Sequence, residues 1–314
     1  MKRIQILLPA YNGEAYIRKQ LDSFVRLKNF DEVKVLVRDD GSTDGTVGIL
    51  REYERDYGFE IITGENIGLA DNVFELMRHC DMSCDYFSFS DQDDVWLPFK
   101  LDRAVAALDR EDNSKPLMYS SCSDITDADL NVVGKTLSPR RPLSFYNAMI
   151  QNVCPGHTQV CNRELMKLVR SRYSSRVYMI DMWYYLAATA FGKVIFDDVS
   201  STLYRQHGNN TMGYETGFIR KNLQRLKRAR NYNSNRNLIM LRDFLNVYRD
   251  ILPTEYCDEL EKFFTMQKGF FSRLGYIFNT RAYRQSGYED ILFKLMYLFG
   301  RYNTASLPVG KENT

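Results

Sequence analysis

Short β-branched and aromatic runs alternate with helix-like segments over the first 120 residues of this chain. In each helix-like segment the apolar residues recur at helical spacing, so the pattern predicts a mostly parallel sheet with helices on both of its faces. The expected strands are residues 4–8, 33–37, 60–63, 86–90 and 117–121. The expected helices are residues 15–27, 46–57, 69–78 and 100–108. In such an α/β sheet, ligands bind beyond the carboxyl ends of the strands, so the segments after strands one, two and four are the ones to inspect.

The rest of the chain has a different pattern. Residues 119–213 are rich in polar and aromatic residues and contain one clear helical pattern, at 179–190. From Tyr214 onward the composition shifts to long helices with many Lys, Arg, Tyr and Phe residues. We therefore expect a first domain at 1–213 and a C-terminal helical appendage at 214–314.

Charge, hydropathy and cysteine spacing limit the class of protein. The formal net charge of +2 is too small to indicate nucleic acid by itself. No apolar run reaches the roughly 20 residues needed to cross a bilayer, and the first residues turn polar too soon for a secretory signal. The six cysteines lack the paired short spacings of zinc and redox motifs. These features predict a cytoplasmic protein with buried or incidental thiols.

The strongest chemical signal is the run DQDDVW at residues 91–96, which directly follows the fourth expected strand. The carboxylates of Asp91, Asp93 and Asp94 repel one another, so this arrangement is costly unless a cation neutralises it. A Mg²⁺ or Mn²⁺ ion held by oxygen ligands and shared with a diphosphate meets this need. The plainer interpretation is an acidic turn or helix cap before Pro98.

A second acidic segment, RDDGSTDG at residues 38–45, follows the second expected strand. Helix capping at Asp44 and a tight turn at Gly41 explain the end of this segment. They leave Asp39 and Asp40 unexplained, and a carboxylate there could accept hydrogen bonds from a pyrimidine N–H or from ribose hydroxyls.

A third segment, LPAYNGE at residues 8–14, closes the first expected strand. It could lay backbone and the ring of Tyr11 against a base. Taken alone this signal is weak, since Pro, Asn and Gly are common turn formers.

Four motifs occur in order, each after an expected strand, namely PAYNGE at 9–14, DDGSTDGT at 39–46, ENIGLADN at 65–72 and DQDDVW at 91–96. Together they resemble the nucleotide-binding half of a family 2 glycosyltransferase, whose GT-A fold has a Rossmann-like, mostly parallel sheet. The DQDDVW form and the downstream YRQHGNN at 204–210 are similar to bacterial rhamnosyltransferases of surface polysaccharide synthesis. The resemblance covers roughly residues 4–213.

The resemblance implies a set of site residues. Those expected to bind the nucleotide and donor sugar are Pro9, Ala10, Tyr11, Asp39, Asp40, Asn66, Gly68, Asn72, Asp91 and Arg205. Asp91 and Asp93 are the expected metal ligands, with Asp94 as a helper. His207 is expected to complete the coordination of the metal, although a lone histidine is more often structural or solvent-exposed.

The segment Ile180-Asp181-Met182-Trp183 stands where many relatives show His-Asp-Trp-Trp, so the resemblance implies that Asp181 is the general base. Inverting transfer needs one carboxylate on the acceptor side of the anomeric carbon. In the first turn of a predicted helix, the helix dipole would favour the ionised form of Asp181, although a simple helix-start acid is the alternative. Trp183 and His157 are expected near the acceptor, and a turn histidine equally explains His157.

Basic residues cluster late in the chain. Residues 220–230 include six basic residues among eleven, and further Lys and Arg residues alternate with aromatic ones between 268 and 284. Such amphipathic helices suit an anionic membrane surface, where each well-placed cation contributes about 1 kcal/mol. A solvated helix face is the alternative, and no nucleic-acid recognition module accompanies the charge.

The combined expectation is an inverting hexosyltransferase on the inner face of the cell membrane. By resemblance it moves L-rhamnose from dTDP-rhamnose onto a glycan or a lipid-diphosphate-linked acceptor, with a UDP-hexose as the alternative donor. A sugar nucleotidyltransferase would carry a Gly-rich basic loop where PAYNGE stands. The complete acidic set together with Asp181 disfavours a non-catalytic, sugar-nucleotide-binding scaffold.

Overall fold

The computed structural model describes residues 2–174, 176–207 and 234–302. The chain divides into two compact units, one made of Met1–Pro139 and Asn152–Tyr214 and the other of Arg140–Gln151 and Glu215–Thr314. The basic run at 220–230, which we expect to meet a membrane, lies outside the described residues, as do 208–210 of the YRQHGNN motif.

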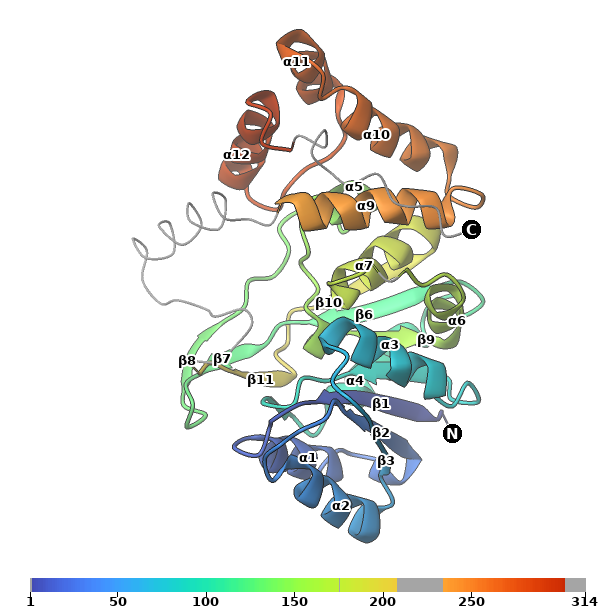
Figure 1. Cartoon of the computed structure of the whole chain (residues 1–314), viewed down its shortest axis with the longest axis vertical. Helices are drawn as coiled ribbons and strands as arrows, with labels where there is room; N and C mark the ends of the chain where they lie inside the picture. Colours follow the sequence, from blue (N-terminus) through green and yellow to red (C-terminus); the bar gives the residue numbers. More distant parts are fainter. Residues whose placement is uncertain (1, 175, 208–233, 303–314) are drawn as a thin grey trace. The chain divides into compact units, whose positions relative to one another are not determined.

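Among the described residues, a seven-stranded sheet forms the centre of the first unit (Figure 1). In spatial order its strands are β10 (Lys193–Asp197), β6 (Leu117–Ser121), β9 (Val160–Asn162), β4 (Tyr86–Phe89), β1 (Ile4–Ala10), β2 (Val33–Asp39) and β3 (Glu60–Thr63). Neighbouring strands are parallel except at β9, which is antiparallel to both β4 and β6. The expected mostly parallel sheet is therefore confirmed.

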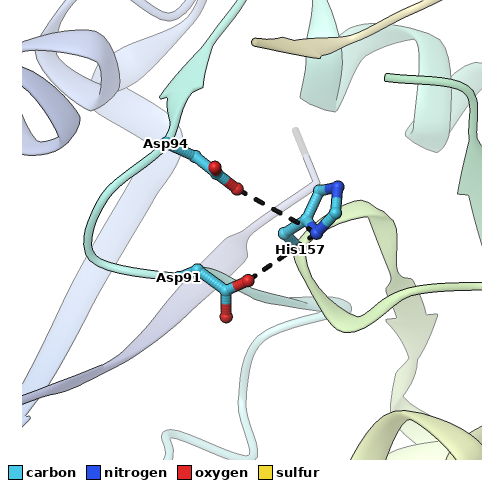
Figure 2. Close-up of side chains that lie close together, drawn as sticks. All are labelled: Asp91, Asp94 and His157. Atoms are coloured by element: carbon cyan, nitrogen blue, oxygen red, sulfur yellow. Dashed lines mark ion pairs between the residues drawn. The ribbon is translucent and has the colours of Figure 1, made fainter. Parts of the chain in front are cut away.

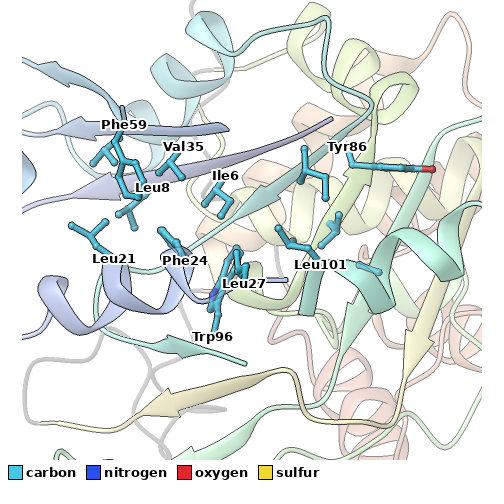
Figure 3. Packing of buried hydrophobic residues seen from close by; sticks show 14 of the residues in the cluster. Ile6, Leu8, Leu21, Phe24, Leu27, Val35, Phe59, Tyr86, Trp96 and Leu101 are labelled. Carbon is cyan, nitrogen blue, oxygen red and sulfur yellow. The ribbon is translucent and has the colours of Figure 1, made fainter. Parts of the chain in front are cut away.

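Helices cover both faces of this sheet (Figure 1). On one face, Ile6 and Leu8 of β1 join a buried core with α1 (Ile17–Val25), α2 (Thr46–Tyr57) and α4 (Lys100–Leu108), as Figure 3 shows. Since successive strand residues point to opposite faces, Leu7 points to the other side, where α3 (Leu69–His79), α6 (Arg163–Ser171) and α7 (Ile180–Phe191) pack. The helices expected from apolar spacing are all present, with ends that differ by at most two residues.

A smaller sheet lies beyond the carboxyl ends of the main strands. Its described strands, in order, are β5 (Val95–Trp96), β11 (Thr202–Arg205), β7 (Asp124–Thr126) and β8 (Val132–Lys135). Strand β5 continues the acidic motif directly, and β11 carries the start of the YRQH segment. Because β5 and β11 pair antiparallel, with Leu203 opposite Val95, the sheet brings these two distant motifs together.

The second unit is helical. Its described helices are α5 (Phe145–Ala148), α9 (Ser234–Tyr248), α10 (Thr254–Thr265), α11 (Phe270–Asn279) and α12 (Gly287–Leu298). Aromatic side chains fill its interior, where the rings of Tyr276 and Tyr297 lie 4.3 Å apart and Phe263 packs against both. Within the described ranges, no helix is long and apolar enough to span a membrane.

Candidate active site

The acidic motif forms the loop between β4 and β5, at the carboxyl end of β4. Because β4 and β1 are parallel neighbours, this loop meets the residues that follow β1. The Gln92 amide makes two hydrogen bonds with the backbone of Tyr11, accepting from its N–H and donating to its carbonyl oxygen, each at 2.9 Å. Gly13 leaves room for this contact, since a Cβ there would lie 2.5 Å from Gln92 Oε1. The first and fourth motifs are thus fastened to each other.

Asp91, Asp94 and His157 form a compact group (Figure 2). His157 Nδ1 lies 3.6 Å from Asp91 Oδ2 and 4.0 Å from Asp94 Oδ2. Asp94 and His157 are buried, whereas the Asp91 side chain is 49% exposed. On its other side, His157 Nε2 is hydrogen-bonded to Ser123 Oγ at 2.9 Å, and the ring stacks on Tyr204. One accessible carboxylate therefore lies above a buried carboxylate and a buried imidazole.

Charge and burial oppose each other in this group. Burial raises the pKa of Asp94, because it penalises the ionised carboxylate. Burial alone would lower the pKa of His157, but the negative charges of Asp94 and Asp91 outweigh it, and the pKa is raised. The imidazole is therefore held toward its charged form by the two carboxylates.

Lys100 is bonded to the backbone of His157, a member of this group. Its fully buried ammonium donates to the carbonyl oxygen of His157 at 2.8 Å and to Thr202 Oγ1 at 3.1 Å, and it lies over the Trp96 ring. Burial lowers the pKa of Lys100 to about 7, against the raising effect of the charges of Asp94 and Asp91. A buried lysine therefore lies next to the acidic loop and is bonded to its neighbours His157 and Thr202.

Asp93 pairs with His207 in the same loop region. Asp93 Oδ2 lies 2.8 Å from His207 Nε2, and the His207 ring stacks on Tyr16 with 4.4 Å between ring centroids. Burial raises the pKa of Asp93, the charge of Asp91 adds to this, and the bond to His207 opposes both. The structure thus places the nitrogen atoms of His157, His207 and Lys100 close to the three carboxylates of the loop.

Arg205 is buried and holds the acidic loop in place. Its Nε donates to the carbonyl oxygen of Asp93 at 2.7 Å, its backbone N–H donates to Asp94 Oδ1 at 3.1 Å, and one terminal nitrogen donates to the carbonyl oxygen of Ala128 at 2.7 Å. The guanidinium also lies 4.8 Å from the centroid of the Tyr16 ring. These contacts show that Arg205 holds the acidic loop in place, and its expected binding of the donor stays a prediction.

Asp39 and Asp40 are both buried at the end of β2, and their oxygens bond to neighbouring loops. Asp39 accepts hydrogen bonds from the backbone N–H groups of Gly41 and Ser42 at 3.1 and 2.9 Å. Asp40 pairs with Arg38 at 2.6 Å and accepts from the backbone N–H groups of Ile67 and Gly68. The second motif is thereby tied to the ENIG segment.

The other expected donor residues lie around the same edge of the sheet. Pro9 and Ala10 end β1, and Tyr11 follows them with a partly exposed ring. Gly68 has a positive φ of 87°, which glycine adopts without strain, and it precedes α3. Asn66 is exposed, whereas Asn72 is buried and its Oδ1 has no hydrogen-bond partner.

Asp181 lies in the first turn of α7, as its sequence position predicts. It is linked to the acidic group through the short turn η2 (Gly156–Thr158). Gly156 packs against it, since a Cβ at 156 would lie 3.5 Å from the Asp181 Cβ, and the next residue is His157. Burial raises the pKa of Asp181, hydrogen bonds from Met182 N–H and Asn152 lower it, and the nearby charge of Asp91 raises it further. The half-buried carboxylate therefore lies within electrostatic reach of Asp91.

Two residues expected near the acceptor have almost no exposed surface. Trp183 is fully buried on α7, and His157 is 3% exposed beneath Asp91. A helix that is apolar on nearly all sides turns most of its residues into the core, which explains Trp183. Neither side chain has the surface needed to contact an acceptor directly, and the group of Asp91, Asp94 and His157 gives His157 a place in the acidic cluster instead.

Sequence reasoning missed several residues of the site. Lys100 carried a readable signal, because it shares the spacing of the buried helix residues Leu101, Ala104 and Leu108. A lysine on the buried face of an amphipathic helix indicates a specific partner. Gln92 and Asn152 carried no such signal, since their contacts join segments 81 and 29 residues apart.

The donor set suits a divalent cation. The ligand atoms of Asp91, Asp94 and His157 all lie within 4.8 Å of one another, and Asp94 Oδ2 is buried without a hydrogen-bond partner. Carboxylate oxygens are the ligands that Mg²⁺ and Mn²⁺ prefer, and an imidazole is compatible with Mn²⁺. Asp93, next to this group, is the remaining carboxylate that could join it.

Comparison with known proteins agrees with this geometry. A family model described as "Glycosyl transferase family 2" matches residues 5–165, which is more than half of the chain. The dTDP-rhamnosyl transferase RfbG of Shigella flexneri is 29% identical over 236 residues, covering 71% of this chain and 79% of that protein. An uncharacterized protein of Mycobacterium bovis is 26% identical over 210 residues, and the match spans 66% of this chain but only 59% of that protein.

Solved structures show the same fold. The structure of S. aureus TarS residues 1–349 in complex with UDP-GlcNAc superposes with a TM-score of 0.53 at 16% identity, covering 94% of this chain and 81% of that one. The complex of the same protein with UDP gives a TM-score of 0.54 over 89% of this chain and 75% of that one. The GT-A architecture expected from the four motifs is confirmed.

Proposed function

The chain belongs to glycosyl transferase family 2, and from this premise we propose that it is a metal-dependent, inverting hexosyltransferase that uses a nucleotide diphosphate sugar. The observation that carries the proposal is the turn η2, in which Gly156 packs against Asp181 and His157 contacts Asp91. Two consecutive residues of η2 therefore lie against the proposed base, Asp181, and a proposed metal ligand, Asp91. Inverting transfer needs both groups, because the acceptor hydroxyl loses its proton while the diphosphate departs.

In this proposal Asp181 accepts the proton of the acceptor hydroxyl while that oxygen attacks the anomeric carbon. The bond from that carbon to the diphosphate breaks on the opposite face, so the configuration inverts. The raised pKa of Asp181 favours this role, because a base with a pKa nearer neutrality accepts a proton more readily. The position of Asp181 in the first turn of α7 favours its ionised form and opposes the effect of burial.

Asp91, Asp93 and Asp94, with His207 or His157, would hold Mg²⁺ or Mn²⁺. When bound, such an ion neutralises the charge that develops on the departing diphosphate. Tyr11, Asp39 and Asp40, with Pro9, Ala10, Asn66, Gly68 and Asn72 near them, would bind the nucleoside and donor sugar. Arg205 would act by fixing the backbone of Asp93.

We propose dTDP-β-L-rhamnose as the donor, which would give an α-L-rhamnoside on a glycan or lipid-linked oligosaccharide in bacterial surface polysaccharide synthesis. The support is the 29% identity to the dTDP-rhamnosyl transferase of Shigella flexneri. A UDP-hexose is the alternative, since TarS, which has the same fold, is known in complex with UDP-GlcNAc.

We also propose that the helical unit meets an anionic membrane surface on the cytoplasmic side. Phe271 and Phe278 are seven residues apart on α11, so they share a face, and they are 84% and 80% exposed. Phe299, after α12, is 70% exposed. Lys268 and Arg301 are exposed close to these rings in sequence, and cations beside exposed aromatic rings favour an anionic lipid surface.

A panel of nucleotide sugars tests the enzymatic proposal without knowledge of the acceptor. Purified protein is incubated with dTDP-rhamnose, UDP-glucose, UDP-galactose and UDP-N-acetylglucosamine, each with Mn²⁺, with Mg²⁺ and with EDTA. We expect slow, metal-dependent release of dTDP from dTDP-rhamnose. If only UDP is released, the donor is a UDP-hexose and not dTDP-rhamnose. If no donor releases its nucleoside diphosphate in a metal-dependent way, the proposal is wrong.

A further inference from the structure

Asp181 is oriented by a residue outside every motif of the sequence. Asn152 Nδ2 donates to Asp181 Oδ2 at 2.7 Å, and Asn152 Oδ1 accepts from the backbone N–H of Cys154 at 3.1 Å. A flipped amide would place two oxygens against each other and two N–H groups against each other. Both ends of the Asn152 amide therefore specify one orientation, in which a donor faces the carboxylate.

The loop that follows Asn152 is fastened to the start of α7. Gln159, which is buried, donates from Nε2 to the carbonyl oxygen of Cys154 at 2.7 Å and to that of Asp181 at 2.8 Å. The loop and the base thus share one hydrogen-bond network.

We propose that Asn152 is a positioning residue for Asp181. This inference rests on the proposed function, in which Asp181 is the general base.

Loss of the Asn152 amide has two expected effects on Asp181. The carboxylate loses a hydrogen bond that favours its ionised form, while the raising effects of burial and of the Asp91 charge remain. Met182 N–H and Gly156 still act to lower the pKa, and Cys154 is the other titratable group nearby. The acidic limb of the rate profile should therefore move to higher pH. A misoriented base also slows the chemical step, and displacements of about 1 Å can cost roughly 100-fold in rate.

The test uses the full chain, Mn²⁺ and the sugar nucleotide that the wild type hydrolyses fastest. In Asn152→Leu we expect the maximal rate to fall roughly 10–100-fold. We expect the calorimetric affinity for the nucleoside diphosphate with Mn²⁺ to stay within about twofold, because this variant touches no nucleotide contact. If Asn152→Leu fails to fold by circular dichroism, Asn152→Asp replaces it, since an aspartate still accepts from Cys154 but cannot donate to Asp181.

The outcomes separate this inference from the proposed function. An Asp181→Asn variant with the wild-type rate would remove Asp181 as the base, which is a failure of the proposed function. An inactive Asp181→Asn together with a wild-type Asn152→Leu would overturn the positioning role alone.

Discussion

The carboxylate of Asp93 and the ring of His207 meet at 2.8 Å, although 114 residues separate them in the chain. Strand pairing makes this contact possible, because β5 follows Asp93 and β11 precedes His207, and the two strands are antiparallel neighbours. The YRQH segment is thereby a fixed part of the acidic site. The predictions below follow from this and from the contacts around it.

Replacement of His207 by Ala should weaken metal binding. The pair with Asp93 orients a carboxylate proposed to hold the ion, and the loss of such a ligand or of its support costs roughly 10–100-fold in metal affinity. Calorimetric titration of Mn²⁺ in the presence of dTDP measures the change. His79→Ala is the matched control, since His79 is exposed on α3 and bonds only within its own helix among the contacts of the described residues. Equal affinity in His207→Ala and the wild type would contradict the prediction.

Asp181→Asn should abolish sugar transfer but retain donor binding. An amide has nearly the same shape as the carboxylate but cannot accept the proton, and loss of a general base costs roughly 100- to 10,000-fold in rate. The maximal rate of donor turnover and the calorimetric affinity for dTDP are the two measurements. A fall in dTDP affinity as large as the fall in rate would assign Asp181 to binding.

Lys100→Met should destabilise the first unit. The change leaves the carbonyl oxygen of His157 and Thr202 Oγ1 without their buried donor, and each such loss costs about 1–3 kcal/mol. The free energy of unfolding in urea measures the effect. Lys167→Met, at an exposed ion pair with Glu164, is the control and should stay within about 0.5 kcal/mol of the wild type. Stability equal to that of the control would mean that the buried ammonium contributes nothing.

In the metal-free protein, the free energy of unfolding should fall less steeply with rising pH in Asp94→Asn than in the wild type. Burial raises the pKa of Asp94 in the folded state, so above the ordinary aspartate pKa of 3.8 the folded state binds more protons than the unfolded state. Stability therefore falls as pH rises from that value through the folded-state pKa. The neutral amide cannot titrate, so the free energy of unfolding of Asp94→Asn should depend less on pH across this window. If the free energy of unfolding depends on pH equally in Asp94→Asn and in the wild type, both measured with EDTA, this prediction is wrong.

The double change Phe271→Ser and Phe278→Ser should weaken binding to anionic vesicles. Burial of each phenylalanine in a lipid interface is worth about 1.5–3 kcal/mol, so removal of both should lower the partition coefficient by at least about tenfold. Co-sedimentation with phosphatidylglycerol vesicles, and with phosphatidylcholine vesicles as the neutral comparison, measures it. Leu69→Ser with Leu137→Ser replaces two other exposed apolar residues, which belong to the first unit, and should have no effect. If the wild type binds neither kind of vesicle but elutes as a dimer on size-exclusion chromatography, the exposed rings serve self-association.

Local pattern accounts well for the elements of the fold. The helix expected at 46–57 is α2, Thr46–Tyr57, because its apolar spacing is regular and Gly58 ends it with a positive φ of 69°. The strand expected at 117–121 is likewise β6. Strand β9, by contrast, is three residues long and enters the sheet antiparallel. Three residues are too few for periodicity to identify, and only its neighbours β4 and β6 specify that it is a strand.

The sequence by itself determined the alternating strands and helices of the first 121 residues, the family, and the positions of the acidic motifs at the ends of strands, because each of these depends on residues adjacent in the chain. Tertiary structure alone decided which side chains of the candidate site lie next to one another. It set His157 against Asp91, put Lys100 beneath Asp94, buried Trp183, and gave Asp181 its partner Asn152. These contacts connect segments far apart in sequence, and their energies depend on burial and on distances of a few ångströms, which no local pattern of residues specifies.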